Sequence, residues 1–259
     1  MIEFSGAATP DRVLPLLWRG TAAAKPGPAV GRPPRLSIDA VVAAATALAD
    51  AEGLTAMSMA RVAADLGVGT MTLYGYVPSR AELVDLMVDD ALSRHALPGP
   101  GQPRPADWRG QVRAYADRTR RMYEAHPWLC QISTVRPPVG PGVLAEREYV
   151  LSTVVGLGLP PRHVDAAALA ITAAVTAAAR HAAENILLLR ATGESTDAWW
   201  GRQDRLWEEY FDERHYPTMN RLWHDGGFAT GTDEQAADGH AFGLSALLDG
   251  IEAAAGRRG

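Results

Sequence analysis

Residues 61–78 read RVAADLGVGTMTLYGYVP, and this stretch decides the fold that we expect. Two short segments with apolar residues at helical spacing flank the turn at Gly67–Gly69, and Ser58 is placed to cap the first of them. The second segment begins at Thr70 and must end before Pro78, because the residue before a proline avoids the helical region. Two short helices joined by a glycine-containing turn are typical of a helix-turn-helix, which this stretch predicts.

The expected second helix carries hydroxyl and apolar side chains and no charge. Such a helix suits the major groove, because hydroxyls bond base edges or phosphates and methyl groups contact thymine. Ser58 and Arg80 lie at the starts of the neighbouring helices, where they are placed to contact backbone phosphates. An ordinary helical subdomain with an accidental glycine turn is the alternative. The candidate DNA-binding residues are Ser58, Arg61, Thr70, Met71, Thr72, Tyr74, Tyr76 and Arg80.

Composition narrows the functional class. The 259 residues include 25 Lys and Arg against 30 Asp and Glu, and the net charge of −5 argues against a protein that coats nucleic acid non-specifically. One cysteine excludes an internal disulfide.

We find no phosphate loop, nucleophile elbow, dinucleotide fingerprint or metal motif, so we expect no enzyme, no cofactor and no metal. The apolar runs are too short for a signal peptide or a membrane span, which predicts a cytoplasmic protein without membrane contact.

Clusters of proline and glycine divide the chain into blocks, and the apolar residues between them recur at helical spacing. We therefore predict an all-α fold with a basic N-terminal extension at 1–36, a three-helix helix-turn-helix domain at 37–97 and a helical body at 98–259. Residues 1–35 carry a net charge of +3 (five basic and two acidic residues). This extension is either an arm that follows the DNA backbone or enters the minor groove, or a disordered leader with four residues packed on the body, Val13, Leu16, Leu17 and Trp18.

About sixty residues of the N-terminal half resemble the DNA-binding region of the TetR family of one-component repressors. The resemblance is carried by IDAVVAAA at 38–45, EGL at 52–54, VAADLGV at 62–68 and TLYGYVPSRAEL at 72–83. It implies a fourth helix that links to the C-terminal body and a homodimer that reads a near-palindromic operator. This chain departs from the family at Ala60, where a basic residue is frequent, and at Gly75.

The body is similar, more loosely, to the tetracycline repressor branch of that family. An apolar stripe at helical spacing predicts a core helix, and it consists of Trp108, Val112, Tyr115, Thr119 and Met122. The resemblance implies that this helix also lines an effector cavity. The place of the branch's metal-binding histidine falls on Ile132 or Ser133, which argues against tetracycline as the effector. A small apolar or aromatic effector is expected instead. The candidate effector-binding residues are His95, Tyr115, Thr119, Tyr123, Arg136 and Glu184.

Two further body helices are expected at 161–189 and 238–255. In the family, two such helices from each subunit form a four-helix dimer interface, and intrachain core packing is the alternative. Between them lies an aromatic cluster, which either belongs to a partly buried helix or closes a pocket over a large apolar molecule. Its members are Trp199, Trp200, Trp207, Tyr210, Phe211, Tyr216 and Trp223.

These observations predict a ligand-responsive repressor that releases a palindromic operator when its effector binds. The alternative is a ligand- or partner-binding protein of the same fold that has lost specific DNA reading. The charge count at 31–97, five arginines against eight acids, favours this alternative unless the acids are segregated from the DNA-facing side. Activation in place of repression also fits the sequence.

Overall fold

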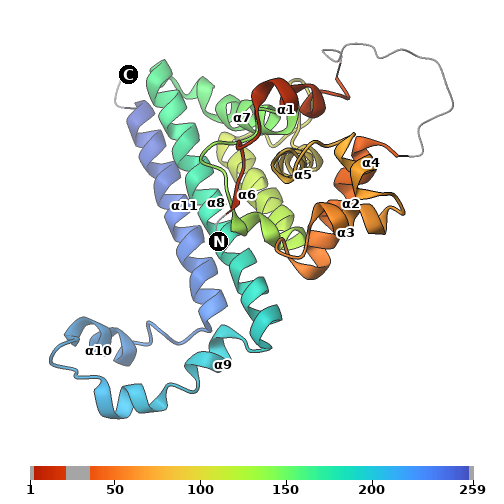
Figure 1. The fold of residues 1–259 in the computed structure, drawn as a ribbon. Helices are drawn as coiled ribbons and strands as arrows, with labels where there is room; N and C mark the ends of the chain where they lie inside the picture. The colour runs from red at the N-terminus through yellow and green to blue at the C-terminus, as the bar shows by residue number, and fades with distance from the viewer. Residues whose placement is uncertain (1–2, 22–35, 257–259) are drawn as a thin grey trace. The chain divides into compact units, whose positions relative to one another are not determined.

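The computed structural model describes residues 3–21 and 36–256, and helices dominate it (Figure 1). The all-α prediction is confirmed. A parallel pair of two-residue strands, in which Glu3 pairs with Ile132 and Phe4 with Ser133, was not predicted because strands this short leave no periodicity. The elements are β1 (Glu3–Phe4), α1 (Pro10–Leu17), α2 (Ile38–Glu52), α3 (Met59–Asp65), α4 (Thr70–Tyr74), α5 (Arg80–Arg94), α6 (Trp108–Ala125), η1 (Pro127–Gln131), β2 (Ile132–Ser133), α7 (Pro141–Val154), η2 (Val155–Leu157), α8 (Pro161–Thr192), α9 (Thr196–Trp200), the π-helix η3 (Leu206–Tyr210), α10 (Pro217–His224) and α11 (Thr232–Gly256).

Side-chain caps begin α2, α3, α5, α6 and α9. The Ser37 hydroxyl accepts a hydrogen bond from the backbone N–H of Ala40 at 3.1 Å, and the Asp107 carboxylate accepts one from Gly110 at 2.7 Å. The helix α8 runs three residues past its expected end because Gly193, at φ +71°, supplies the stop. The helix α11 begins six residues earlier than expected, with two acidic residues in its first turn.

The chain forms two compact units, residues 1–183 and 184–259. The helix-turn-helix region and the first part of the body therefore share one unit, and no separation falls at residue 97. The functional division that we expect at that position stays a prediction. The second unit comprises the end of α8 together with α9, η3, α10 and α11.

The helix α5 is the centre of the first unit. It packs against α1, α2 and α7, and Leu83, Val84 and Met87 are fully buried on it. Gly140 and Gly142, at the start of α7, make the close approach to α5 possible. A Cβ atom at Gly142 would lie 2.7 Å from Ser93 Oγ and 2.8 Å from the Ser93 backbone nitrogen. The helix that follows the helix-turn-helix is thereby held tightly to the body.

The described part of the N-terminal extension packs on the rest of the first unit. Val13 and Leu17 of α1 are buried, and the Trp18 indole N–H donates to the carbonyl of Val139 at 2.9 Å. The Gly6 backbone N–H donates to the Asp85 carboxylate of α5 at 2.7 Å. Residues 3–21 thus follow the packed-leader alternative, whereas the basic stretch at 22–35 lies outside the described residues, and its contact with DNA stays a prediction.

By length and composition alone α8 is apolar enough to cross a membrane, with a mean hydropathy of 1.3 over its most apolar 18 residues. Helices in the cores of water-soluble proteins pass the same test. One face of α8, with Val164, Ala168, Ile171 and Val175, is buried within the protein. The uncharged run within α8, Ala166–Ala179, is shorter than a membrane span because Asp165 and Arg180 bound it.

Candidate functional site

The helix α4 presents an uncharged face to solvent. Gly67, at φ +66°, makes the turn from α3, a conformation that other L-residues rarely adopt. Leu73 is fully buried and anchors α4 on the core, whereas Met71 is 82 % exposed and Tyr74 is 40 % exposed. Thr72 is exposed as well, and Thr70 and Tyr76 are half-buried. The predicted reading face therefore projects outward, as contact with DNA requires.

The candidate DNA-binding residues Ser58, Arg61 and Arg80 make contacts within the protein. The Ser58 hydroxyl accepts from the backbone N–H of Arg61 at 3.3 Å and caps α3. The Arg61 guanidinium pairs with Glu52 at 2.7 Å. Arg80 pairs with Glu3 of the N-terminal segment at 2.7 Å and donates to the carbonyl of Leu54. Their contacts with DNA stay a prediction. Arg80 can pair with a phosphate only if its ion pair with Glu3 breaks.

Three of the eight acidic residues that weighed against DNA binding are buried. Glu82, Asp85 and Asp89 of α5 are buried. Burial raises the pKa of the Asp85 carboxyl, partly offset by its hydrogen bond from Gly6. Burial likewise raises the pKa of Asp89, which accepts from the backbone N–H of Val143 at 3.0 Å. These three acids are therefore removed from the surface, whereas Asp39, Glu52 and Asp65 remain exposed.

Three candidate effector residues meet in one buried cluster between the end of α5 and the middle of α6. Thr119 Oγ1 lies 3.3 Å from His95 Nε2, and the ring centroids of His95 and Tyr115 are 5.9 Å apart. All three side chains are buried. Within the described residues His95 Nδ1 has no hydrogen-bond partner, although it is inaccessible to solvent. Buried polar atoms are rarely left unpaired, which makes this nitrogen a candidate ligand contact.

Two residues of α7 complete the cluster, and sequence reasoning missed both. The Tyr115 hydroxyl donates to the Glu146 carboxylate at 2.9 Å. Burial raises the pKa of that carboxyl, which the hydrogen bond from Tyr115 partly offsets. Tyr149 packs at 6.3 Å from Tyr115 between ring centroids. Glu146 sits among charged neighbours in the sequence, and only the packing of α7 shows which of them turns inward.

The remaining candidate effector residues differ in their placement. Tyr123 is buried one turn further along α6, and burial raises the pKa of its hydroxyl. Arg136 is exposed, and its backbone carbonyl accepts from the Ser5 hydroxyl at 3.0 Å. Glu184 is exposed on the part of α8 that belongs to the second unit. The structure therefore brings together His95, Tyr115 and Thr119, with Tyr123 beside them, and their role in binding an effector stays a prediction.

No group of three or more histidine, cysteine, aspartate or glutamate side chains within residues 3–21 and 36–256 is placed to hold a metal ion. The lone Cys130 of η1 is buried. What the cluster around His95 offers is therefore hydrogen bonding by hydroxyl, imidazole and carboxyl groups, surrounded by aromatic rings.

The burial of His95 predicts a pH dependence of stability. Desolvation, aided by the charge of Arg118, lowers the pKa of His95 from 6.5 to about 4. Between these values the unfolded chain binds a proton that the folded protein does not, so the free energy of unfolding falls as the pH drops. The shift corresponds to about 3 kcal/mol. We expect urea unfolding at pH 7 and near pH 4 to show this loss in the wild type and a smaller one in His95→Gln.

The exposed His163 provides the control for this measurement. The variant His163→Gln should keep the wild-type difference between the two pH values. An equal loss of stability on acidification in the wild type and in His95→Gln would show that His95 is not buried as a neutral imidazole.

Comparisons with known proteins agree over nearly the whole chain. The sequence profile of the tetracyclin repressor-like C-terminal domain matches residues 100–255, and that of the bacterial regulatory proteins of the tetR family matches residues 41–87. The HTH-type transcriptional repressor DrrR1 of Streptomyces coeruleorubidus is 38 % identical over 256 residues, which cover 99 % of this chain and 90 % of that protein.

Solved structures show the same architecture. Apo ActR from Streptomyces coelicolor superposes with a TM-score of 0.68 at 27 % identity, covering 89 % of this chain and all of that one. ActR in complex with actinorhodin gives a TM-score of 0.67 at 28 % identity, covering 85 % of this chain and 99 % of that one. Both comparisons include the helix-turn-helix and the helical body.

Proposed function

The chain belongs to the TetR family of bacterial transcriptional regulators, and from this premise we propose that it represses transcription by binding a palindromic operator through α4 and releases it when a small apolar or aromatic effector binds the body. The observation that carries the proposal is the solvent-exposed, uncharged face of α4, anchored by the buried Leu73. The named function of the relative DrrR1, a transcriptional repressor, supports repression over activation.

Operator reading of this kind requires a dimer, because a palindrome presents two half-sites. A two-fold dimer places its two recognition helices roughly 34–36 Å apart, about one turn of DNA. Two body helices carry uncovered apolar side chains suited to a subunit interface. Phe242 of α11 is exposed, as is Leu169 of α8. Large apolar side chains that are exposed on helices support a homodimer formed through α8 and α11. A regulator of this kind acts on chromosomal DNA and is therefore cytoplasmic.

The effector site that we propose is the cluster of His95, Tyr115, Thr119 and Glu146. Its unpaired His95 Nδ1 and its hydroxyls provide hydrogen bonds, and its tyrosine rings provide apolar contact. The related ActR binds actinorhodin, which supports a small-molecule effector for this chain. His95, Tyr115 and Thr119 are buried, so an effector that contacts them lies inside the first unit.

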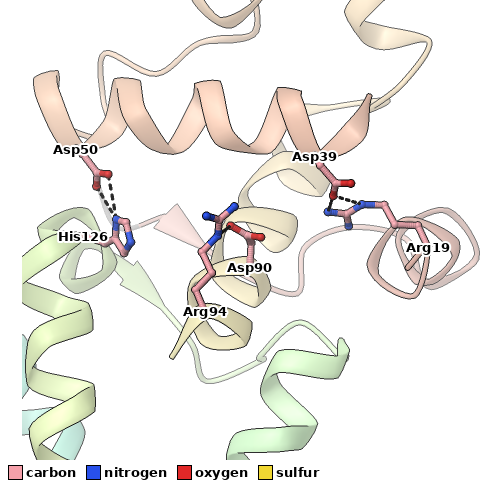
Figure 2. Close-up of polar contacts among 6 residues, drawn as sticks. All are labelled: Arg19, Asp39, Asp50, Asp90, Arg94 and His126. Atoms are coloured by element: carbon pink, nitrogen blue, oxygen red, sulfur yellow. Dashed lines mark hydrogen bonds and ion pairs between the residues drawn. The ribbon is translucent and has the colours of Figure 1, made fainter. Parts of the chain in front are cut away.

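Figure 2 shows α2, which packs against α5, with Asp39 and Asp50 near its two ends, each bound to another part of the first unit. At its start Asp39 pairs with Arg19 at 2.6 Å, and at its end Asp50 accepts from His126 Nδ1 at 2.9 Å. The Asp50 carboxylate also accepts from the Trp128 indole at 2.7 Å. The pair of Asp90 and Arg94 lies within α5 itself. Because His126 follows α6, a shift of α6 on effector binding reaches α2 through Asp50.

Binding to DNA from upstream of the protein's own gene tests the proposal. We expect fluorescence anisotropy to show specific binding that weakens as salt rises, because phosphate contacts release counterions. An effector should then lower the affinity for this operator. The rival function, a ligand- or partner-binding protein without DNA reading, predicts no specific binding even at low salt. Its support, the net negative charge at 31–97, is weakened by the burial of three acids on α5.

A further inference from the structure

A cavity lies within the second unit. It has a volume of about 760 Å³, in the range of small-molecule sites. Its lining residues come from α9, η3, α10, the start of α11 and the segments between them. The proposed function makes no use of this cavity.

The apolar wall of the cavity consists of aromatic rings. Trp207 is central, with its ring centroid 6.2 Å from that of Trp200 and 6.1 Å from that of Trp223. Phe211 packs edge-on against Trp207 at 5.4 Å, and Phe228 closes the far side beside Trp223. Trp223 is nevertheless 61 % exposed. Trp200 is 41 % exposed and Trp207 37 % exposed, so part of each indole is accessible to a ligand.

The polar wall of the cavity is acidic. Asp197, Asp204 and Glu213 line it together with one histidine, His224, and no arginine or lysine does. Asp197 accepts from the backbone N–H and the hydroxyl of Thr232, both at 2.7 Å, and these bonds lower the pKa of its carboxyl. Asp197 therefore stays ionised and joins α9 to the start of α11. The Glu213 carboxylate accepts from the Asn220 amide at 3.2 Å, which holds it on the same wall.

We propose that this cavity binds a flat aromatic cation, which the tryptophan faces hold by stacking and by cation–π attraction and the carboxylates hold by charge. Aromatic faces carry negative potential and attract cations most strongly when the rings are tryptophan. Anionic aromatic molecules would meet the carboxylates and be rejected. The volume admits a ligand of two to four fused rings in addition to water.

The test compares two dyes of similar shape and opposite charge on the full-length protein without DNA. The first is 9-aminoacridine, a planar cation, and the second is acridine-9-carboxylate, a planar anion. We expect fluorescence anisotropy to show saturable binding of the cation and at least about tenfold weaker binding of the anion. Because no DNA is present, the result is independent of operator recognition.

Three variants locate the site. Trp207→Leu should weaken 9-aminoacridine binding about tenfold, and Asp204→Asn combined with Glu213→Gln about fivefold. The charge variant changes no apolar contact, so it remains informative if Trp207→Leu misfolds. Tyr210→Leu is the matched control, because Tyr210 lies on the same π-helix and is 66 % exposed but does not line the cavity. It should bind the cation as the wild type does.

The proposal is overturned if both dyes bind equally or if the charge variant and the control bind alike. It is also overturned if Trp207→Leu alters the sedimentation coefficient while dye binding is unchanged. In that case the aromatic wall contacts a second copy of the chain and does not hold a small ligand.

Discussion

Replacing Tyr74 by alanine is expected to weaken operator binding by about 100-fold while the protein stays folded and dimeric. A good side-chain contact to a base edge contributes roughly 1–3 kcal/mol, and a two-fold dimer loses the contact twice. Tyr74 is exposed on α4 and contributes little to the core, whose anchor in this helix is Leu73. Thr72→Ala should have the same direction of effect, and a smaller one, because its side chain offers less contact area. Anisotropy titrations on the operator measure both.

Tyr210→Ala serves as the control for Tyr74→Ala, since it removes an exposed tyrosine from the second unit. Its operator affinity should equal that of the wild type. The assignment of α4 as the reading helix would be contradicted if Tyr74→Ala left the affinity unchanged. It would also be contradicted if the variant lost affinity only through dissociation into monomers, which sedimentation analysis detects.

Replacing Gly142 by alanine is expected to destabilise the protein, although alanine is the better helix former. Intrinsic propensity favours alanine by about 1 kcal/mol inside a helix. The added Cβ would lie 2.7 Å from Ser93 Oγ and also press on the backbone of α5 at Ser93 and Asp89. Backbone atoms cannot rotate aside, so α5 and α7 must separate. Overpacking of this kind costs about 1–3 kcal/mol net, which urea unfolding measures as a lower midpoint.

The neighbouring Gly156 offers a matched substitution. A Cβ atom there would meet no other atom within 4 Å. Gly156→Ala should therefore leave stability unchanged or raise it by a few tenths of a kcal/mol, because it restricts only the unfolded chain. Equal effects of the two substitutions would show that α5 and α7 are not in close contact. Since α5 joins the helix-turn-helix to the body, Gly142→Ala should also change operator affinity at concentrations where the protein is folded.

The helix-turn-helix was predictable because its signals act between near neighbours in the sequence. Ser37 and Ser58 each cap a helix by accepting a hydrogen bond from the backbone N–H three residues further along the chain. Gly67 permits a backbone conformation that other residues rarely adopt. The uncharged face of α4 can be read from residue types alone. The core stripe of α6 was predictable for a similar reason, because apolar residues three and four apart share one helix face.

The sequence by itself thus determined the helical class, the turn before α4 and the character of the reading face. Only the tertiary structure decided that Arg80 pairs with Glu3, that three acids of α5 are buried and that Glu146 meets Tyr115. Arg80 and Glu3 lie 77 positions apart in the sequence, and Tyr115 and Glu146 lie 31 positions apart. They depend on desolvation and on the close packing of whole helices, and neither leaves a local pattern in the chain.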